Sequence, residues 1–162
     1  MKMMEIANSN IKESTVFIIG IFGILWNKFE RLLGRNCRES NISDNLHKIM
    51  PRYNEESILN LHAVVLQRIA SLRQTTNDYV MNKLCVGKNT SDKTNQPLVK
   101  NFIDRYYDLT REQKLQSAVV ITYRIRCNMF HGEKDTNATD ITSLDNQFVL
   151  FQTINSFLEK LV

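Results

Sequence analysis

From residue 113 to residue 131 the chain reads QKLQSAVVITYRIRCNMFH, and this stretch decides the fold. Because successive residues of an α-helix are about 100° apart, its side chains separate into faces. One face is a core stripe made of Leu115, Ala118, Thr122, Ile125 and Met129. Most of the remaining surface is also apolar, and the narrow polar sector opposite holds Gln113, Ser117, Arg124, Asn128 and His131. The pattern predicts a helix at the centre of the fold.

Apolar residues recur at helical spacing in four other stretches. These stretches are 14–34, 54–72, 97–106 and 144–161. Thr110 and Gln113 have the spacing of a capping box at the start of the central helix. No stretch shows the alternation of a strand. We therefore expect an all-α fold, a single-domain up-and-down bundle of about five helices.

The segments between these helices are expected to be less regular. Residues 1–12 are expected to be loosely ordered, and 39–53 irregular, since Pro51 interrupts a helix. Residues 87–96 have no large apolar side chain and are expected to form a flexible loop. The apolar patch 79–86 either continues the second helix or follows a break. The whole chain, 1–162, is expected to be one domain.

Composition limits the function only loosely. A net charge of +4 is a mild bias towards anionic partners. Three widely spaced cysteines, with no secretory signal before them, suggest a reducing cytoplasm. No pair of cysteines or histidines has metal-ligand spacing, so we expect neither a metal nor a cofactor. The apolar run 15–26 is too short to cross a bilayer and is expected to be a core helix without membrane contact.

The C-terminal end of the central helix carries the candidate chemistry. Arg126 is a permanent cation, and His131 titrates near neutral pH, so together they suit metal-free phosphodiester chemistry. On a straight helix they point apart, and they can meet only if the helix ends or bends near Gly132. Arg124, by contrast, shares a face with Asn128 and His131. The plainer alternative is that His131 caps the helix and Arg126 spans a groove between helices.

A basic cluster follows the first helix. Arg31, Arg35 and Arg38 either bind phosphate or complement the dipole at the helix end. With Arg52 they are also a candidate surface for holding RNA.

The string from Tyr123 to Lys134 (YRIRCNMFHGEK) resembles the signature of the HEPN superfamily, an Arg followed after four to six residues by a His and often a Gly. The string 26–30 (WNKFE) is similar to a first-helix segment in some branches of that superfamily. This resemblance implies a HEPN-like helical domain. Such a domain is typically a homodimer whose two motifs face each other across one cleft.

The resemblance also implies a function. Catalytic members are metal-independent endoribonucleases, often found in toxin–antitoxin or defence systems. Carried over, Arg126 would stabilise charge on the scissile phosphate, His131 would transfer a proton, and Asn128 would orient the site. Arg124 and Lys134 would bind flanking RNA phosphates. Cys127 stands where many members have a polar residue, often Asn, and this departure bears on activity.

The alternative function is a non-catalytic module. Proteins resembling this superfamily also act as binding or dimerisation partners of RNA, of an antitoxin or toxin, or of a nucleotidyltransferase subunit. Variants of Arg126 and His131 distinguish the two functions, because only an enzyme loses activity while staying folded.

Overall fold

The computed structural model describes residues 3–6, 9–34, 39–72, 93–130 and 145–162. Within these ranges lie six α-helices, three short 3₁₀ helices and one β-hairpin. The α-helices are α1 (Glu13–Leu33), α2 (Glu39–Asn45), α3 (Glu55–Leu72), α5 (Gln96–Asp104), α6 (Arg111–Phe130) and α8 (Phe148–Leu161). The 3₁₀ helices are η1 (Leu46–Lys48), η2 (Met50–Arg52) and η3 (Tyr106–Asp108), and the strands are β1 (Met3–Ile6) and β2 (Ser9–Lys12). The predominantly helical fold confirms the predicted all-α class.

α6 lies at the centre of the core, as its sequence predicts. Leu115, Ala118, Thr122 and Ile125 of the predicted stripe are all buried. The adjoining run from Val119 to Ile121 is fully buried as well. A helix that is apolar on most sides is stable only when other helices cover it, so the rest of the fold is built around this one.

The start of α6 is a capping box. The Thr110 backbone N–H donates to Gln113 Oε1 at 3.0 Å, and the Gln113 N–H donates to Thr110 Oγ1 at 3.2 Å. Each side chain thus satisfies a backbone donor that the first helical turn leaves open. The same logic holds for α3, where Asn54 Oδ1 accepts the Ser57 N–H at 2.8 Å. The predicted capping box at Thr110 and Gln113 is confirmed.

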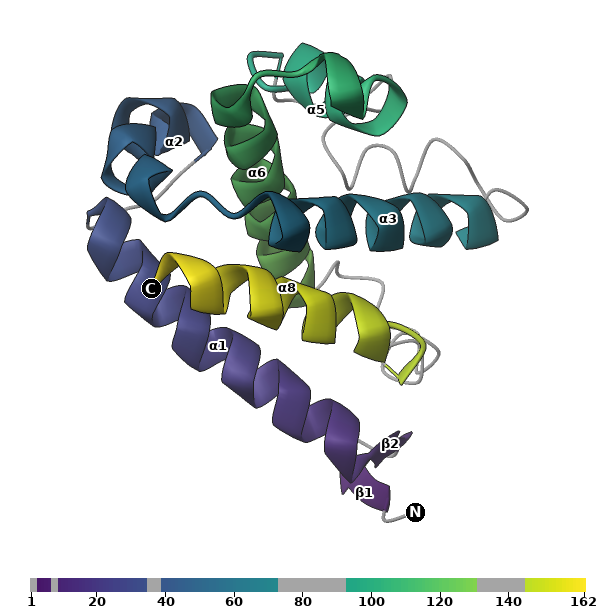
Figure 1. Cartoon of the computed structure of the whole chain (residues 1–162). Coiled ribbons are helices and arrows are strands. Elements are labelled where there is room, and N and C mark those ends of the chain that lie inside the picture. Colours follow the sequence, from purple (N-terminus) through teal and green to yellow (C-terminus); the bar gives the residue numbers. More distant parts are fainter. Residues whose placement is uncertain (1–2, 7–8, 35–38, 73–92, 131–144) are drawn as a thin grey trace.

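The helices pack in two directions (Figure 1). α3 and α8 lie side by side and run antiparallel, and α1 packs on the other side of α8. α6 crosses behind this layer and contacts α3, while α5 packs against α6 near its start. Because α6 crosses the layer instead of running alongside it, the predicted up-and-down order does not describe this helix.

The ends of α1 are held in two different ways. Gly34 ends the helix with φ 107°, a backbone conformation that favours glycine, and its N–H donates to the Glu30 carbonyl at 2.9 Å. At the start, the N-cap residue is Lys12, and its side chain makes no capping hydrogen bond. Instead Asp145 accepts the Lys12 N–H at 3.2 Å and the Thr15 hydroxyl at 2.5 Å. A carboxylate distant in sequence therefore caps α1.

Residues 39–53 are more regular than expected. α2, η1 and η2 fill this segment, and Pro51 lies at the first positions of η2, where a proline is tolerated. Ile42, Leu46 and Ile49 are fully buried. Their spacing of four and three residues is a helical signal that outweighs the proline.

The helical spacing in α3 predicts a buried face made of Leu59, Ala63, Leu66, Ile69 and Leu72, and this prediction is correct only in part. Ile69 is buried and Leu59 is half-buried against the core, whereas Ala63 and Leu66 are exposed. Ile58, Leu61 and Val65 are buried instead. Both sets of apolar residues have helical spacing, and only the packed neighbours α6 and α8 select between them.

The first residues also differ from expectation. β1 and β2 pair antiparallel, with Met3 opposite Lys12 and Ile6 opposite Ser9, where the sequence shows no strand signal. Ile11 of β2 is buried. Within the described ranges, none of the helices combines the length and hydropathy that crossing a membrane requires.

Candidate functional site

The last turns of α6 pack against the middle of α1. Trp26 of α1 is almost fully buried, and its ring centroid lies 6.0 Å from that of Tyr123. Arg126 places its Cζ 5.9 Å from the same Trp26 ring. Arg124, Arg126 and Cys127 are all half-buried. A cation over an indole face gains roughly 0.5–1 kcal/mol or more, so Trp26 helps to hold the Arg126 guanidinium in place.

The structure places only part of the predicted site. Arg124 and Arg126 lie on the final turns of α6, while the Asn128 side chain, His131 and Lys134 lie outside the described residues. The meeting of Arg126 with His131 therefore stays a prediction. Cys127 is a free thiol.

Two of the four arginines of the predicted basic surface, Arg31 and Arg52, lie within the described residues. Arg31 is exposed in the last turn of α1, and Arg35 and Arg38 lie outside the described residues. Arg52 donates from Nη1 to the Leu161 carbonyl at 2.6 Å. Since this bond satisfies a terminal carbonyl of α8, Arg52 has a structural role at that helix end.

A second polar site, the Glu55 cluster, links the start of α3 to η3 and α6. It consists of Tyr53, Glu55, Tyr106, Arg111 and Lys114. Glu55 Oε1 accepts the Tyr106 hydroxyl and Lys114 Nζ, each at 2.9 Å, and Oε2 accepts the Tyr53 hydroxyl. Arg111 Cζ lies 4.4 Å from the centroid of the Tyr53 ring, and Lys114 Nζ lies 4.5 Å from that of Tyr106.

The pKa values within the Glu55 cluster follow from these bonds. Burial alone would raise the pKa of Glu55, but donation by Tyr53, Lys114 and Tyr106 outweighs it and lowers the pKa from 4.5. Burial, together with the hydrogen bond to the Glu55 carboxylate, raises the pKa of Tyr53 to about 12. The same two causes raise the pKa of Tyr106. The cluster thus keeps the Glu55 carboxylate charged, beside neutral tyrosine hydroxyls and cations. This arrangement suits a structural contact between α3 and α6 better than it suits proton transfer.

His62 lies next to this cluster on α3. Its ring is stacked 4.4 Å from Tyr106 and packs edge-on against Phe102 at 5.2 Å. Among the residues that the structure describes, Nε2 is buried and has no hydrogen-bond partner. Burial lowers the pKa of His62 from 6.5, which keeps the ring neutral.

The sequence interpretation missed the Glu55 cluster. The partners of Glu55 lie 51 and 59 residues further along the chain, at Tyr106 and Lys114. No local spacing relates residues so far apart, so only packing brings them together.

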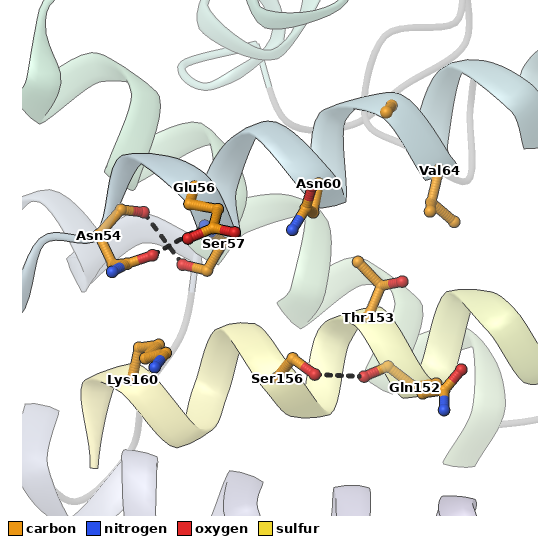
Figure 2. Close-up of a pocket in the computed structure, with 10 residues that line it drawn as sticks. Asn54, Glu56, Ser57, Asn60, Val64, Gln152, Thr153, Ser156 and Lys160 are labelled. Carbon is orange, nitrogen blue, oxygen red and sulfur yellow. Dashed lines mark hydrogen bonds between the residues drawn. The ribbon is translucent and has the colours of Figure 1, made fainter.

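A groove of about 490 Å³ runs between α3 and α8. Figure 2 shows Asn60 of α3 and Thr153 of α8 pointing into the space between the helices, with Lys160 near the end at Asn54. Six of the ten residues that line it carry an amide or a hydroxyl. Such a lining suits a neutral, hydrogen-bonding ligand, while Glu56 and Lys160 add one charge of each sign.

Within the part of the chain that the structure describes, no group of three or more His, Cys, Asp or Glu side chains is arranged to bind a metal ion. No protein-family model, curated protein or solved structure matches this chain.

Proposed function

We propose that this protein is a cytoplasmic, HEPN-like, metal-independent endoribonuclease that acts as a homodimer in a toxin–antitoxin or defence setting. The proposal rests on the resemblance of residues 123–134 to the HEPN motif. The observation that supports it most is the position of Arg126, half-buried on the last turns of α6 with its guanidinium against Trp26. An Arg supported in this way is oriented before a phosphate arrives.

The proposed reaction uses the ribose 2′-hydroxyl as nucleophile. Its oxygen bonds to the adjacent phosphorus as the bond from phosphorus to the 5′ oxygen breaks, which leaves a 2′,3′-cyclic phosphate and a 5′-hydroxyl end. His131 takes the proton from the 2′ oxygen or delivers one to the leaving 5′ oxygen. Arg126 neutralises the charge that develops on the phosphate. DNA has no 2′-hydroxyl and is not cut.

The remaining motif residues have supporting roles in this proposal. Asn128 orients the site by hydrogen bonding, and Arg124 and Lys134 bind flanking phosphates without reading sequence. In a homodimer, two copies of the motif share one cleft.

The test is incubation of the purified protein with labelled RNA in excess EDTA. We expect cleavage with cyclic phosphate ends, reduced about 10²- to 10⁴-fold in Arg126→Ala and His131→Ala. Circular dichroism of each variant checks that the fold is intact. Arg105→Ala and His47→Ala are the matched controls, because both residues are exposed and lie outside the motif.

Two outcomes would overturn this proposal. Cleavage that survives both motif substitutions would point to a contaminant. Absence of cleavage on structured and unstructured RNAs would favour the alternative, a non-catalytic module that binds RNA, an antitoxin or a nucleotidyltransferase partner. The observation that favours this alternative is the polar groove between α3 and α8, whose Asn60 and Gln152 side chains suit hydrogen bonding to a partner.

A further inference from the structure

The groove between α3 and α8 has a primary amide on each of its two walls. Asn60 lies on α3 and Gln152 on α8, and both side chains are exposed. Within the described ranges, neither amide group makes a hydrogen bond. Figure 2 shows Asn60 pointing from α3 towards α8, into the groove. Each amide therefore keeps two N–H donors and one carbonyl acceptor for a ligand.

The hydroxyl groups of the groove can only accept hydrogen bonds from a ligand. Each of them donates its proton to a backbone carbonyl three or four residues earlier, at 2.8 to 3.2 Å, and they belong to Ser57, Thr153 and Ser156. A hydroxyl oxygen that has donated its one proton still has lone pairs that accept. A ligand that fits this lining must therefore bring N–H or O–H donors of its own.

The chemistry of the lining narrows the class of ligand further. None of the ten described residues that line the groove is aromatic, so a nucleobase or a sugar ring finds no surface for stacking. Glu56 and Lys160 have opposite charges, so a phosphate gains no net attraction. A helical segment uses its backbone N–H and C=O groups in internal bonds and would leave the amides of the groove unpaired. An extended peptide has free N–H and C=O groups along both of its edges.

The length of the groove matches a short extended segment. Its lining runs from Asn54 to Val64 on α3 and from Gln152 to Lys160 on α8. At about 1.5 Å per residue these walls are about 12–15 Å long. An extended peptide rises about 3.3 Å per residue, so about four residues fit. Since successive residues of a strand direct their N–H and C=O groups to opposite edges, one edge can pair with Asn60 and the other with Gln152.

The two ends of the groove differ in polarity. Lys160 lies near Asn54 at one end, and Val64 lies at the other (Figure 2). Val149 extends this second end, because it lies one turn before Thr153 on α8 and is 56% exposed. An aliphatic side chain of a bound peptide would be partly removed from water there. The other end suits a polar side chain.

We propose that the groove between α3 and α8 binds an extended peptide segment of a partner protein, about four residues long. Asn60 and Gln152 pair with its backbone from opposite walls, and Val64 and Val149 contact an aliphatic side chain at one end. This inference deepens the alternative function, the non-catalytic module, because it states which kind of partner segment the groove takes. It depends on α3 and α8 alone and is independent of RNA cleavage.

The first test is a nuclear magnetic resonance titration of the full chain with a pool of random hexapeptides. The peptides are acetylated and amidated, so that their ends carry no charge. We expect the side-chain amide signals of Asn60 and Gln152 to shift and to saturate, whereas those of Asn101, an exposed amide on α5, should not move. The same pool with N-methylated backbones is the matched ligand control. It lacks the backbone N–H donors and should not bind.

The second test uses the tightest-binding sequence of the pool and variants of the groove. Asn60→Ala and Gln152→Ala should each weaken binding about tenfold, because each removes a pair of hydrogen bonds. Val149→Ser should weaken it about threefold, since the aliphatic side chain then loses an apolar contact. Asn101→Ala is the matched control and should bind like the parent. Circular dichroism checks that every variant is folded.

Three outcomes would overturn the inference. The peptide pool could leave the Asn60 and Gln152 signals unchanged at about 1 mM, or the N-methylated pool could bind equally well, so that the backbone is not recognised. Thirdly, a glucose trisaccharide could shift these signals in place of the peptides, which would make the groove a saccharide site. RNA cleavage by Asn60→Ala should equal that of the parent, so failure of the proposed ribonuclease would leave the peptide result unaffected.

Discussion

Single residues decide how the Glu55 cluster holds α3 against α6. Tyr106 is almost fully buried, and its hydroxyl depends on Glu55 for a hydrogen bond. We expect Glu55→Ala to lower the free energy of unfolding by about 1–3 kcal/mol, because a buried hydroxyl would lose its partner. Urea unfolding followed by circular dichroism measures this change.

The neighbouring Glu56 offers a matched control for that measurement. Glu55 and Glu56 both lie in the first turn of α3, so both interact with its dipole. Glu56→Ala should change the free energy of unfolding by no more than about 0.5 kcal/mol. Equal effects at the two positions would contradict the anchoring role and leave only a dipole effect. Adding Tyr106→Phe to Glu55→Ala should recover part of the loss, since no hydroxyl is then left unpaired.

At the scale of one element, α1 has glycines in two opposite situations, Gly34 directly after its last residue and Gly23 within it. Gly34 has φ 107°, which a side chain strains, whereas Gly23 is helical with open space around its Cβ direction. We expect Gly34→Ala to destabilise the fold by about 1–3 kcal/mol and Gly23→Ala to stabilise it by up to about 1 kcal/mol. Thermal unfolding of both variants beside the parent protein measures whether each substitution lowers or raises the stability of the fold. A stabilising Gly34→Ala would show that this helix end does not need a glycine.

The same scale explains which helix ends could be predicted. The caps Thr110 and Asn54 use side chains within three residues of the N–H that they accept. A cap of this kind is a local property of the sequence. The cap of α1 is Asp145, which lies 130 residues beyond Thr15 and depends on packing near the start of α8. No motif around Thr15 reveals it.

At the scale of the whole molecule, two ionisable groups make stability depend on pH in acid. The pKa of His62 is lowered from 6.5 and that of Glu55 from 4.5, so the unfolded chain binds more protons than the folded one. Stability should be complete above pH 6.5 and should fall as pH decreases through that value, and again below 4.5. Unfolding in urea at a series of pH values measures this profile. His62→Gln should remove the fall that begins at 6.5, and the exposed His47→Gln should not.

Stability should decline in alkali for the opposite reason. The pKa of Tyr53 is raised from 10.0 to about 12, so the folded state holds this proton more tightly. Its contribution is complete below pH 10 and disappears between pH 10 and about 12. Tyr53→Phe should flatten that part of the profile, and an unchanged decline would exclude Tyr53 as its cause.

The sequence by itself determined the features that depend on neighbouring residues. The all-α class, the core stripe of α6 and the capping box at Thr110 are all confirmed. Each follows from helical spacing or from a backbone preference within one turn. The motif residues Arg126 and His131 can likewise be read from the sequence, while their chemistry remains a proposal.

Tertiary structure decided the features that join distant parts of the chain. It selected the buried face of α3, turned α6 across the layer of α3 and α8, and capped α1 with Asp145. It also brought Glu55 to Tyr106 and Trp26 to Arg126. The physical reason is common to all five. Burial and long-range hydrogen bonds depend on which surfaces pack together. A periodic pattern of apolar residues shows only that a helix has an apolar face, and not which element covers that face.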